Sequence, residues 1–349
     1  MNMQFADEFD TIVKIKVVGV GGGGGNAVNH MVDSKIENVE YVCVNTDLHV
    51  LRASKAAECV QIGAKLTKGR GAGNRPQVGK ESAEESKEEI SAALKGANMV
   101  FITAGMGGGT GTGAAPVVAA IAHEMGILTV GVVTKPFKFE REQKMKQAEA
   151  GIEELSKYVD SLVVIPNERL LAGLDRPLTM KESFALSDEI LWKSVKSISD
   201  LVTTLGDINL DFADITTVMK DAGIAHMATG VGSGKNKAEE AAAAVVSSPI
   251  LETTLEGAGK ILAYITMSED VLSTDVDTFL NLITQTAKTD AEVLFGYAFD
   301  ETLEDTMKVT VIGTGFNTEN DAIPANPDLL AETEAADKSF NDIMNIFGK

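Results

Sequence analysis

Apolar segments alternate with helical patterns along the first half of the chain. Segments rich in valine, isoleucine and other strand-forming residues lie at 11–18, 40–44, 59–62, 99–103, 127–133 and 161–165. The stretches between them are long enough for helices, such as the one expected at 81–94. Strands that alternate with helices at this spacing are typical of a mostly parallel sheet with both faces covered. The pattern therefore predicts an α/β domain with a Rossmann-like, mostly parallel sheet.

The pattern changes after residue 180. Apolar residues recur at roughly helical spacing from 181 to 205, which predicts one long helix that Gly206 ends. Beyond this helix, we expect a further helix at 238–246 and three strands at 260–267, 291–298 and 307–312. This order indicates a second, smaller α+β domain, joined to the first domain by a long central helix.

The glycine-rich segment 104–116, AGMGGGTGTGAAP, follows the strand expected at 99–103 and precedes a helix expected from Pro116. Glycines leave backbone N–H groups open to an anion because no Cβ atom stands in the way, and Thr110 and Thr112 add hydroxyl donors. The sequence contains no Gly-x-x-x-x-Gly-Lys-[Ser/Thr] motif, so the segment is not a P-loop. It is nevertheless predicted to hold a phosphate chain.

A second glycine-rich segment, 19–25, follows the first strand and precedes a helix expected from Asn26. With Asp47 at the end of the next strand, it satisfies the dinucleotide-binding fingerprint, which makes a nicotinamide-dependent oxidoreductase one hypothesis. The match is weak because five consecutive glycines fit almost any spacing. Two glycine-rich turns on neighbouring strands fit the longer phosphate chain of a nucleoside triphosphate better.

Charge narrows the choice of partners. The chain of 349 residues carries 51 acidic and 31 basic side chains, a net charge of −20. A chain this acidic offers no broad basic surface for nucleic acid and does not favour adhesion to anionic lipid. No uncharged apolar run reaches the length of a membrane span, and the first residues lack a signal-peptide pattern. We therefore expect a cytoplasmic protein without a nucleic-acid partner and without direct membrane insertion.

Several loops together resemble the tubulin/FtsZ superfamily of GTPases, and within it the bacterial cell-division branch. The matching segments are 22–26, 45–47, 71–73, 107–113, 134–137, 166–167 and 209–214. The resemblance implies a tubulin/FtsZ-like fold and an enzyme that binds GTP, hydrolyses it to GDP and phosphate, and polymerises head to tail with itself. It also implies Mg²⁺ held mainly by phosphate oxygens and water, with no protein ligand that the sequence identifies.

The resemblance assigns the phosphate contacts to three segments. The first would wrap the α- and β-phosphates with Gly22, Gly23, Gly24, Gly25 and Asn26. The second would hold the β- and γ-phosphates with Gly108, Gly109, Thr110, Gly111 and Thr112. The third, with Ala72 and Gly73, would sense the γ-phosphate.

The base and ribose contacts are implied by the same resemblance. Asn167 and Asp188 would read the guanine edge, since a carboxylate accepts hydrogen bonds from guanine but not from adenine, and Phe184 would stack on the base. Glu140 would contact the ribose together with Lys144, which stands where an arginine is usual in the family. The residues alone also allow an ordinary surface ion pair between Glu140 and Lys144.

An acidic loop follows the long helix. The resemblance implies that this loop reaches the nucleotide of the next subunit, where Asp211 and Asp214 orient or polarise the attacking water and Asn209 approaches the γ-phosphate or Mg²⁺. The residues alone predict something simpler, a helix N-cap with a capping-box partner three residues later. Both interpretations stay open at the level of sequence.

The expected domain boundaries cover the whole chain. They are a GTP-binding domain at 11–180, the central helix at 181–206, the catalytic loop and helix start at 207–221, a C-terminal α+β domain at 222–316, an acidic linker at 317–338 and a partner-binding tail at 339–349. The resemblance implies a role in septum formation at the mid-cell division site, with the tail bound to division-ring adaptor or membrane-anchor proteins. A plain docked or disordered tail, and a tubulin-like GTPase with a non-division role such as DNA segregation, are the alternatives.

Overall fold

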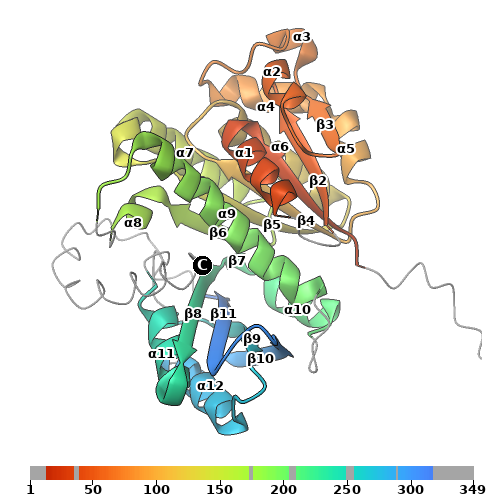
Figure 1. Ribbon diagram of the computed structural model, residues 1–349. Coiled ribbons are helices and arrows are strands. Elements are labelled where there is room, and N and C mark those ends of the chain that lie inside the picture. Colours follow the sequence, from red (N-terminus) through yellow and green to blue (C-terminus); the bar gives the residue numbers. More distant parts are fainter. Residues whose placement is uncertain are drawn as a thin grey trace, which may run out of the picture.

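The computed structural model describes residues 13–34, 39–172, 176–203, 210–248, 255–287 and 290–316 (Figure 1). Seven strands form a parallel sheet: β1 (Ile15–Val20), β2 (Val39–Asn45), β3 (Glu58–Gln61), β4 (Met99–Gly105), β5 (Leu128–Lys135), β6 (Ser161–Pro166) and β7 (Gly223–Ile224). Their order in the sheet is β3-β2-β1-β4-β5-β6-β7, so β1 lies between β2 and β4. The predicted Rossmann-like sheet is confirmed.

Helices connect these strands. They are α1 (Gly21–Asp33), α2 (Leu48–Arg52), α3 (Ala64–Thr67), α4 (Pro76–Glu85), α5 (Lys87–Leu94), α6 (Thr110–Glu124), the 3₁₀-helix η1 (Lys138–Glu140), α7 (Glu142–Leu155), α8 (Asn167–Leu171), α9 (Met180–Thr203) and α10 (Phe212–Met219). The predicted long central helix is α9, and it lies between the first sheet and the smaller unit that follows β7 (Figure 1).

A smaller α+β unit follows β7. Its elements are β8 (His226–Ser233), the 3₁₀-helix η2 (Gly234–Asn236), α11 (Lys237–Val246), β9 (Lys260–Met267), α12 (Ser273–Ala287), β10 (Glu292–Phe299) and β11 (Thr306–Thr314). The sheet order is β10-β9-β11-β8, with β10 and β9 parallel and the other pairs antiparallel. The predicted second, smaller α+β unit is therefore also confirmed.

Alternating side chains of the first sheet enter two separate cores. Along β1, Ile15 and Val17 face the core that contains α1 and α9, whereas Val18 and Val20 face the core that contains α6. The first core continues into the second sheet, where it includes Leu262 of β9. Residues of α9 and of both sheets therefore belong to one apolar core, which joins the two units.

Two helices begin earlier than the sequence predicts. The helix expected from Asn26 begins at Gly21, and the helix expected from Pro116 begins at Thr110 and contains the proline. The glycines allow close approach of backbones: a Cβ atom on Gly24 would overlap the carbonyl oxygen of Thr103. These glycines therefore belong to the packed start of a helix rather than to an open loop.

The sequence pattern missed one strand of the second sheet and joined two helices. The strand β8 carries Gly230 and Gly232, and a Cβ atom on Gly232 would overlap the carbonyl oxygen of Lys237 in α11. The residues of β8 are mostly small because α11 packs directly on the strand's backbone. The strand therefore lacks the alternation of large apolar and polar side chains that predicts a strand from sequence. The helix expected at 81–94 is interrupted at Ser86, where α4 ends and α5 begins.

Among the described residues, no helix combines the length and the hydropathy that crossing a membrane requires. The predicted catalytic residue Asn209, the acidic linker 317–338 and the tail 339–349 lie outside the residues that the structure describes. They therefore stay predictions.

Candidate nucleotide site

Both glycine-rich segments leave the first sheet side by side. The register pairs Val20 of β1 with Ala104 of β4, so the two strands end side by side at the carboxyl edge of the sheet. A Cβ atom on Gly21 would lie 2.6 Å from the backbone nitrogen of Gly111, and one on Gly23 would lie 3.2 Å from the Cα of Gly105. The segments therefore touch backbone to backbone, which residues larger than glycine would prevent.

The helices that follow the two segments cover opposite faces of the sheet. The first, α1, contributes to the core shared with α9, and the second, α6, contributes to the other core. Such a divergence between adjacent parallel strands opens a crevice at the carboxyl edge, and it is the usual position of a nucleotide in sheets of this kind. The amino ends of α1 and α6 meet there with unpaired N–H groups and the positive ends of their dipoles, which favours bound anions.

Two predicted phosphate-binding glycines face open space. Among the described residues, no atom beyond the immediate chain neighbours and the local helix backbone lies within 4 Å of the position that a Cβ atom would take on Gly22 or on Gly108. The predicted residue Asn26 lies one turn after Gly22 on α1, and its side chain is exposed. These three residues lie at or near the starts of the two helices, and their contact with a phosphate chain stays a prediction.

Other residues of the predicted set shape the segments. A Cβ atom on Gly25 would lie 3.2 Å from the Sγ of Cys43, so this glycine lets α1 pack on the sheet. The side chain of Thr112 is only 3% exposed, and its hydroxyl accepts a 2.8 Å hydrogen bond from the backbone N–H of Gly107. In the structure, Gly25 and Thr112 therefore hold the segments in shape from inside.

The third predicted segment lies against the second. A Cβ atom on Gly109 would lie 2.9 Å from the Cβ of Ala72, so the segment that contains Ala72 and Gly73 lies against the second glycine-rich segment. The hydroxyls of Thr46 and Thr110 share a 2.7 Å hydrogen bond beside it. The structure therefore brings together the three segments that were predicted to contact phosphate.

Asn167 begins α8 at the carboxyl end of β6. Its side chain is only 4% exposed, and its Oδ1 accepts a 2.8 Å hydrogen bond from the hydroxyl of Ser187 on α9. This bond fixes the orientation of the amide and leaves the NH₂ group as a donor. Ser187 was not among the predicted site residues, because nothing in the sequence distinguishes it from other helical serines.

Asp188 follows Ser187 on α9, and Phe184 lies one turn before it. Burial raises the pKa of the Asp188 carboxyl to about 6, and the charge of His30 on α1 acts in the opposite direction. The ring of Phe184 is 42% exposed and meets the rings of Phe137 and Phe139 edge to face, at centroid distances of 5.6 and 6.0 Å. The first turns of α9 therefore offer an acceptor and an aromatic face together.

Glu140 and Lys144 form the ion pair that their spacing allows. The Nζ of Lys144 lies 3.0 Å from the Oε2 of Glu140, and the other carboxylate oxygen accepts a 3.1 Å hydrogen bond from the backbone N–H of Phe137. The pair lies beside the second glycine-rich segment, because a Cβ atom on Gly107 would lie 2.8 Å from the carbonyl oxygen of Lys144. A ribose contact by this pair stays a prediction.

The acidic residues Asp211 and Asp214 lie at the other edge of the sheet. They form a capping box at the start of α10: the N–H of Asp214 donates to Asp211 Oδ1 at 2.7 Å, and the N–H of Asp211 donates to Asp214 Oδ2 at 3.1 Å. At the end of α10, the carbonyl oxygen of Met219 accepts a 2.6 Å hydrogen bond from Ser161, the first residue of β6. The helix α10 is thus held at the amino edge of the sheet, opposite the glycine-rich segments.

The separation of the two edges is about the length of a strand. At a rise of about 3.3 Å per residue, a strand such as β4 extends over roughly 20 Å. The structure therefore does not bring Asp211 or Asp214 to the glycine-rich segments of the same chain. The capping box that the residues alone predict is present.

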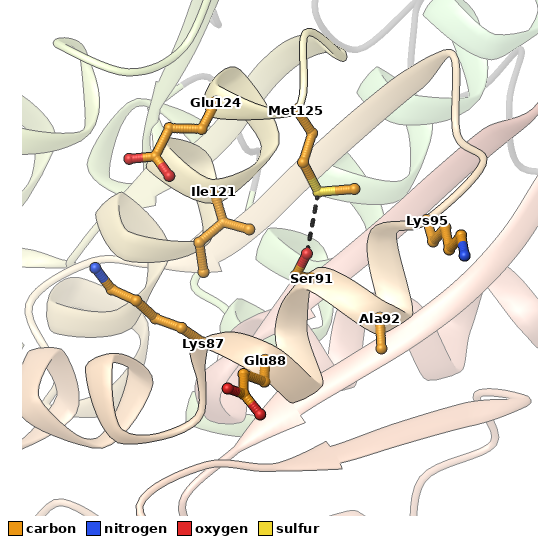
Figure 2. Close-up of a pocket in the computed structure, with 8 residues that line it drawn as sticks. All are labelled: Lys87, Glu88, Ser91, Ala92, Lys95, Ile121, Glu124 and Met125. Atoms are coloured by element: carbon orange, nitrogen blue, oxygen red, sulfur yellow. Dashed lines mark hydrogen bonds between the residues drawn. The ribbon is translucent and has the colours of Figure 1, made fainter.

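A groove of about 760 Å³ lies elsewhere, between α5 and α6 (Figure 2). Charged side chains such as Lys87 and Glu124 rim it, and the hydroxyl of Ser91 donates to the Sδ of Met125 at 3.5 Å across it. It is near the carboxyl end of α6, whereas the glycine-rich segment precedes the amino end, about 20 Å away at 1.5 Å per residue. This groove is therefore separate from the crevice.

Known proteins share this fold. Residues 14–175 match the profile of the tubulin/FtsZ family, GTPase domain, and residues 223–317 match that of the FtsZ family, C-terminal domain. An empty FtsZ dimer from M. jannaschii is 41% identical over 87% of this chain and 88% of that chain, with a TM-score of 0.80. A tryptophan-to-tyrosine mutant of FtsZ from M. jannaschii is 40% identical over 88% and 92%, with a TM-score of 0.82.

A more distant structure shares the fold. It is the GTPgS-bound protofilament of CetZ2 from Haloferax volcanii, 20% identical over 95% of this chain and 99% of that chain, with a TM-score of 0.75. The two M. jannaschii structures carry the family assignment, since their identity is high and their coverage nearly complete. The chain described above therefore belongs to the tubulin/FtsZ family of GTPases.

Proposed function

We propose that the chain is a GTP-dependent filament-forming GTPase of cell division, in which each active site is shared by two subunits. The crevice of one subunit would bind GTP, and the acidic loop of the next subunit would supply the groups that orient the attacking water. An FtsZ dimer and a CetZ2 protofilament are among the similar structures, which supports head-to-tail assembly. Such a contact is heterologous, so it generates open filaments rather than closed pairs.

The observation that carries this proposal is the position of the acidic residues. Asp211 and Asp214 lie at the amino edge of the first sheet, whereas the phosphate crevice lies at the carboxyl edge. A single subunit therefore cannot place these carboxylates beside its own phosphates. Two subunits stacked edge to edge would bring the acidic loop of one over the crevice of the other.

The crevice suits a guanine nucleotide. The NH₂ group of Asn167 would donate to the guanine O6, and the ionised carboxylate of Asp188 would accept from N1–H and the exocyclic amine. Adenine presents a donor where guanine has O6 and an acceptor where guanine has N1–H, so both contacts would fail. The exposed ring of Phe184 would stack on the base.

Hydrolysis in such a site depends on position and charge. The backbone N–H groups at the starts of α1 and α6 would fix the phosphates, and Asp214 with Asp211 would hold a water in line with the γ-phosphate. Asn209, Ala72 and Gly73 would approach the γ-phosphate as well. Bound Mg²⁺ would neutralise phosphate charge through phosphate oxygens and water. Beside the glycine-rich segments, the hydroxyls of Thr46 and Thr110 are neutral groups, which fits such a mode of binding.

The first experiment measures the GTPase rate per subunit against protein concentration, with Mg²⁺, together with sedimentation of polymer. A shared site predicts negligible turnover below a threshold concentration and sedimenting polymer above it. A rate per subunit that does not depend on concentration would mean that each chain holds a complete site, and the roles of Asp211 and Asp214 would then be wrong.

A mixing experiment tests the sharing directly. Asp188→Ala removes base recognition from a subunit but leaves its acidic loop, and Asp214→Asn removes the catalytic charge but leaves its crevice. Each variant alone is expected to be nearly inactive, whereas an equal mixture should recover about a quarter of the wild-type rate, because that share of random contacts joins an intact crevice to an intact loop. No recovery from a mixture that sediments as copolymer would contradict the shared site.

We further propose that the filaments act in cell division. The match of residues 223–317 to the FtsZ C-terminal domain supports this role over the DNA-segregation alternative. A fluorescent fusion at the mid-cell division site, and filamentous cells after depletion, are the expected results. Normal septa after depletion would instead favour a non-division role. Deletion of residues 339–349 should preserve polymerisation in vitro while releasing the division-ring adaptor or membrane-anchor proteins that we expect this tail to bind.

A further inference from the structure

The carboxyl end of α10 is bonded as fully as the amino end that carries the capping box. The last four carbonyl groups of an α-helix have no partner within the helix, and many helices satisfy them with backbone N–H groups of the following turn. In α10 these are the carbonyl groups of residues 216–219. The first accepts from the backbone N–H of Lys220 at 2.9 Å, and the other three accept from side chains of distant strands.

Two of these donors are neighbours on the second sheet. The Nζ of Lys260, the first residue of β9, donates to the carbonyl oxygen of Thr217 at 2.6 Å. The hydroxyl of Thr314, the last residue of β11, donates to the carbonyl oxygen of Val218 at 2.9 Å. The register pairs Thr314 with Lys260. One corner of the second sheet therefore holds two consecutive carbonyl groups of α10.

The third donor belongs to the first sheet. The hydroxyl of Ser161 binds the carbonyl oxygen of Met219, and the chain after α10 continues into β7, whose Gly223 pairs with Ser161. The carbonyl oxygen of Asp160 accepts from the backbone N–H groups of Ala222 and Gly223 at 2.8 and 2.9 Å. The carboxyl end of α10 is therefore bound to both sheets.

Apolar packing holds one side of α10. Ile215, Val218 and Met219 are buried in the core that joins the two units, whereas Asp211 and Thr217 are exposed. Apolar contacts are not directional and tolerate a small shift of a helix along its axis, whereas hydrogen bonds weaken steeply with distance and angle. The position of α10 along its axis is therefore set largely by the bonds at its carboxyl end.

Lys260 differs from the other two donors in charge and in exposure. Its ammonium group is a cation at the carboxyl end of a helix, where the helix dipole and a charge-assisted hydrogen bond both favour it. Lys260 is half-buried, whereas Ser161 and Thr314 are fully buried. Its contact can therefore be removed without opening a cavity in either core.

We propose that Lys260 is a positioning residue for hydrolysis, which sets where Asp211 and Asp214 meet the nucleotide of the next subunit. This role rests on the proposed function, in which the two carboxylates orient the attacking water. The helix has 8 residues, so its ends are about 12 Å apart at about 1.5 Å per residue. Over this length a displacement at the carboxyl end reaches the capping box, and a misplacement of about 1 Å can lower a rate about 100-fold.

The experiment compares wild type with Lys260→Met and Lys260→Arg, and with Lys308→Met as a matched control. Lys260→Met keeps most of the side-chain length but removes the donor and the charge, whereas Lys260→Arg keeps both. Lys308 is near the start of β11 and Thr314 at its end, about 20 Å apart at about 3.3 Å per residue. The control therefore removes the same charge from the same sheet, away from α10. GTP affinity, turnover at saturating GTP and sedimentation of polymer are measured on the full chain.

The expected change is in turnover and not in GTP affinity. We expect the turnover of Lys260→Met to fall about tenfold, while its GTP affinity and sedimentation stay as in wild type, because its crevice is unchanged. Lys260→Arg should keep most of the wild-type rate, and Lys308→Met all of it. Wild-type turnover in Lys260→Met would overturn the inference. So would a parallel loss of GTP affinity or of sedimentation, because that result indicates damage to the fold or to the filament contact.

Mixtures show which side of the subunit contact carries the defect. In an equal mixture with Asp188→Ala, crevices of Lys260→Met meet intact acidic loops, so the rate should reach about a quarter of wild type. In an equal mixture with Asp214→Asn, every loop is defective, so the rate should stay at about a twentieth of wild type. Equal rates in the two mixtures would overturn the inference, because a displaced α10 acts only from the loop side of the contact.

Failure of the proposed function gives a different result. If Asp188→Ala and Asp214→Asn do not complement each other in a sedimenting copolymer, the shared site is wrong and the role of Lys260 is wrong with it. If they complement each other while Lys260→Met hydrolyses GTP like wild type, the shared site stands and only the role of Lys260 is wrong.

Discussion

The two edges of the first sheet are built from different parts of the chain. At the carboxyl edge, the crevice is formed by backbone, with Gly21 and Gly23 in contact with the backbone of the neighbouring segment. At the amino edge, the chemical groups are the side chains of Asp211 and Asp214, which also close a capping box. An edge made of backbone is sensitive to an added atom wherever two backbones touch, whereas an edge made of side chains can lose its charge and keep its fold.

Asp214→Asn should give the largest effect on function with the smallest effect on fold. The asparagine oxygen can still accept the hydrogen bond from the N–H of Asp211, so the capping box persists while the charge is lost. We expect turnover to fall by about 100-fold or more with GTP affinity unchanged. The matched control is Asp277→Asn on α12, which should behave as wild type. Lost GTP affinity in Asp214→Asn would mean that the two edges are not separate.

Gly21→Ala and Gly22→Ala compare two neighbours at the backbone edge. Gly21 has a φ of +75°, and its Cβ atom would lie 2.6 Å from the backbone of Gly111. Gly21→Ala should therefore lower the free energy of unfolding by about 2–4 kcal/mol. Gly22→Ala adds a methyl group in open space, so it should preserve stability and weaken GTP binding. Denaturant unfolding and nucleotide titration measure both, and equal stability losses would contradict the open position of Gly22.

Asp188→Asn should stabilise the nucleotide-free protein. Because the pKa of Asp188 is about 6 in the folded chain and near 4 when unfolded, the folded state holds the proton more tightly. The free energy of unfolding of wild type therefore falls as the pH rises from 4 to 6, and the variant lacks this loss. We expect a gain of about 1–2 kcal/mol at pH 7, after allowance for solvent screening, and none near pH 4. A variant less stable than wild type at pH 7 would contradict the burial of the charge.

Ser187→Ala should give the smallest of these effects. It removes the 2.8 Å hydrogen bond that orients the Asn167 amide, which is worth about 1 kcal/mol. We expect discrimination between GTP and ATP to weaken severalfold, while turnover at saturating GTP stays near that of wild type. Ser194→Ala, at another buried serine of α9, is the control. Unchanged discrimination would place base recognition away from Asn167.

The sequence predicted the positions of β1 to β6 along the chain and the glycine-rich segments that follow β1 and β4, because both rest on local patterns. Runs of valine and isoleucine predict β1 to β6, and glycine-rich segments at strand ends predict the turns between β1 and α1 and between β4 and α6. The sequence predicts later starts for α1 and α6 than the structure shows, because glycine disfavours helices locally. Only the close approach of a neighbouring backbone explains why these glycines lie in the first turns of the two helices. The contacts of Ser187 and Lys260 connect segments distant in sequence, and no local pattern predicts them.

The opposition of the two edges gives a filament polarity. If each contact joins one crevice to one acidic loop, the terminal subunit at one end has a crevice that no loop covers, and the subunit at the other end has a loop with no nucleotide to act on. Exchange of GDP for GTP would then be open at the first end and obstructed along the shaft. The two ends of one filament would consequently grow and shorten at different rates, even though every subunit has the same sequence.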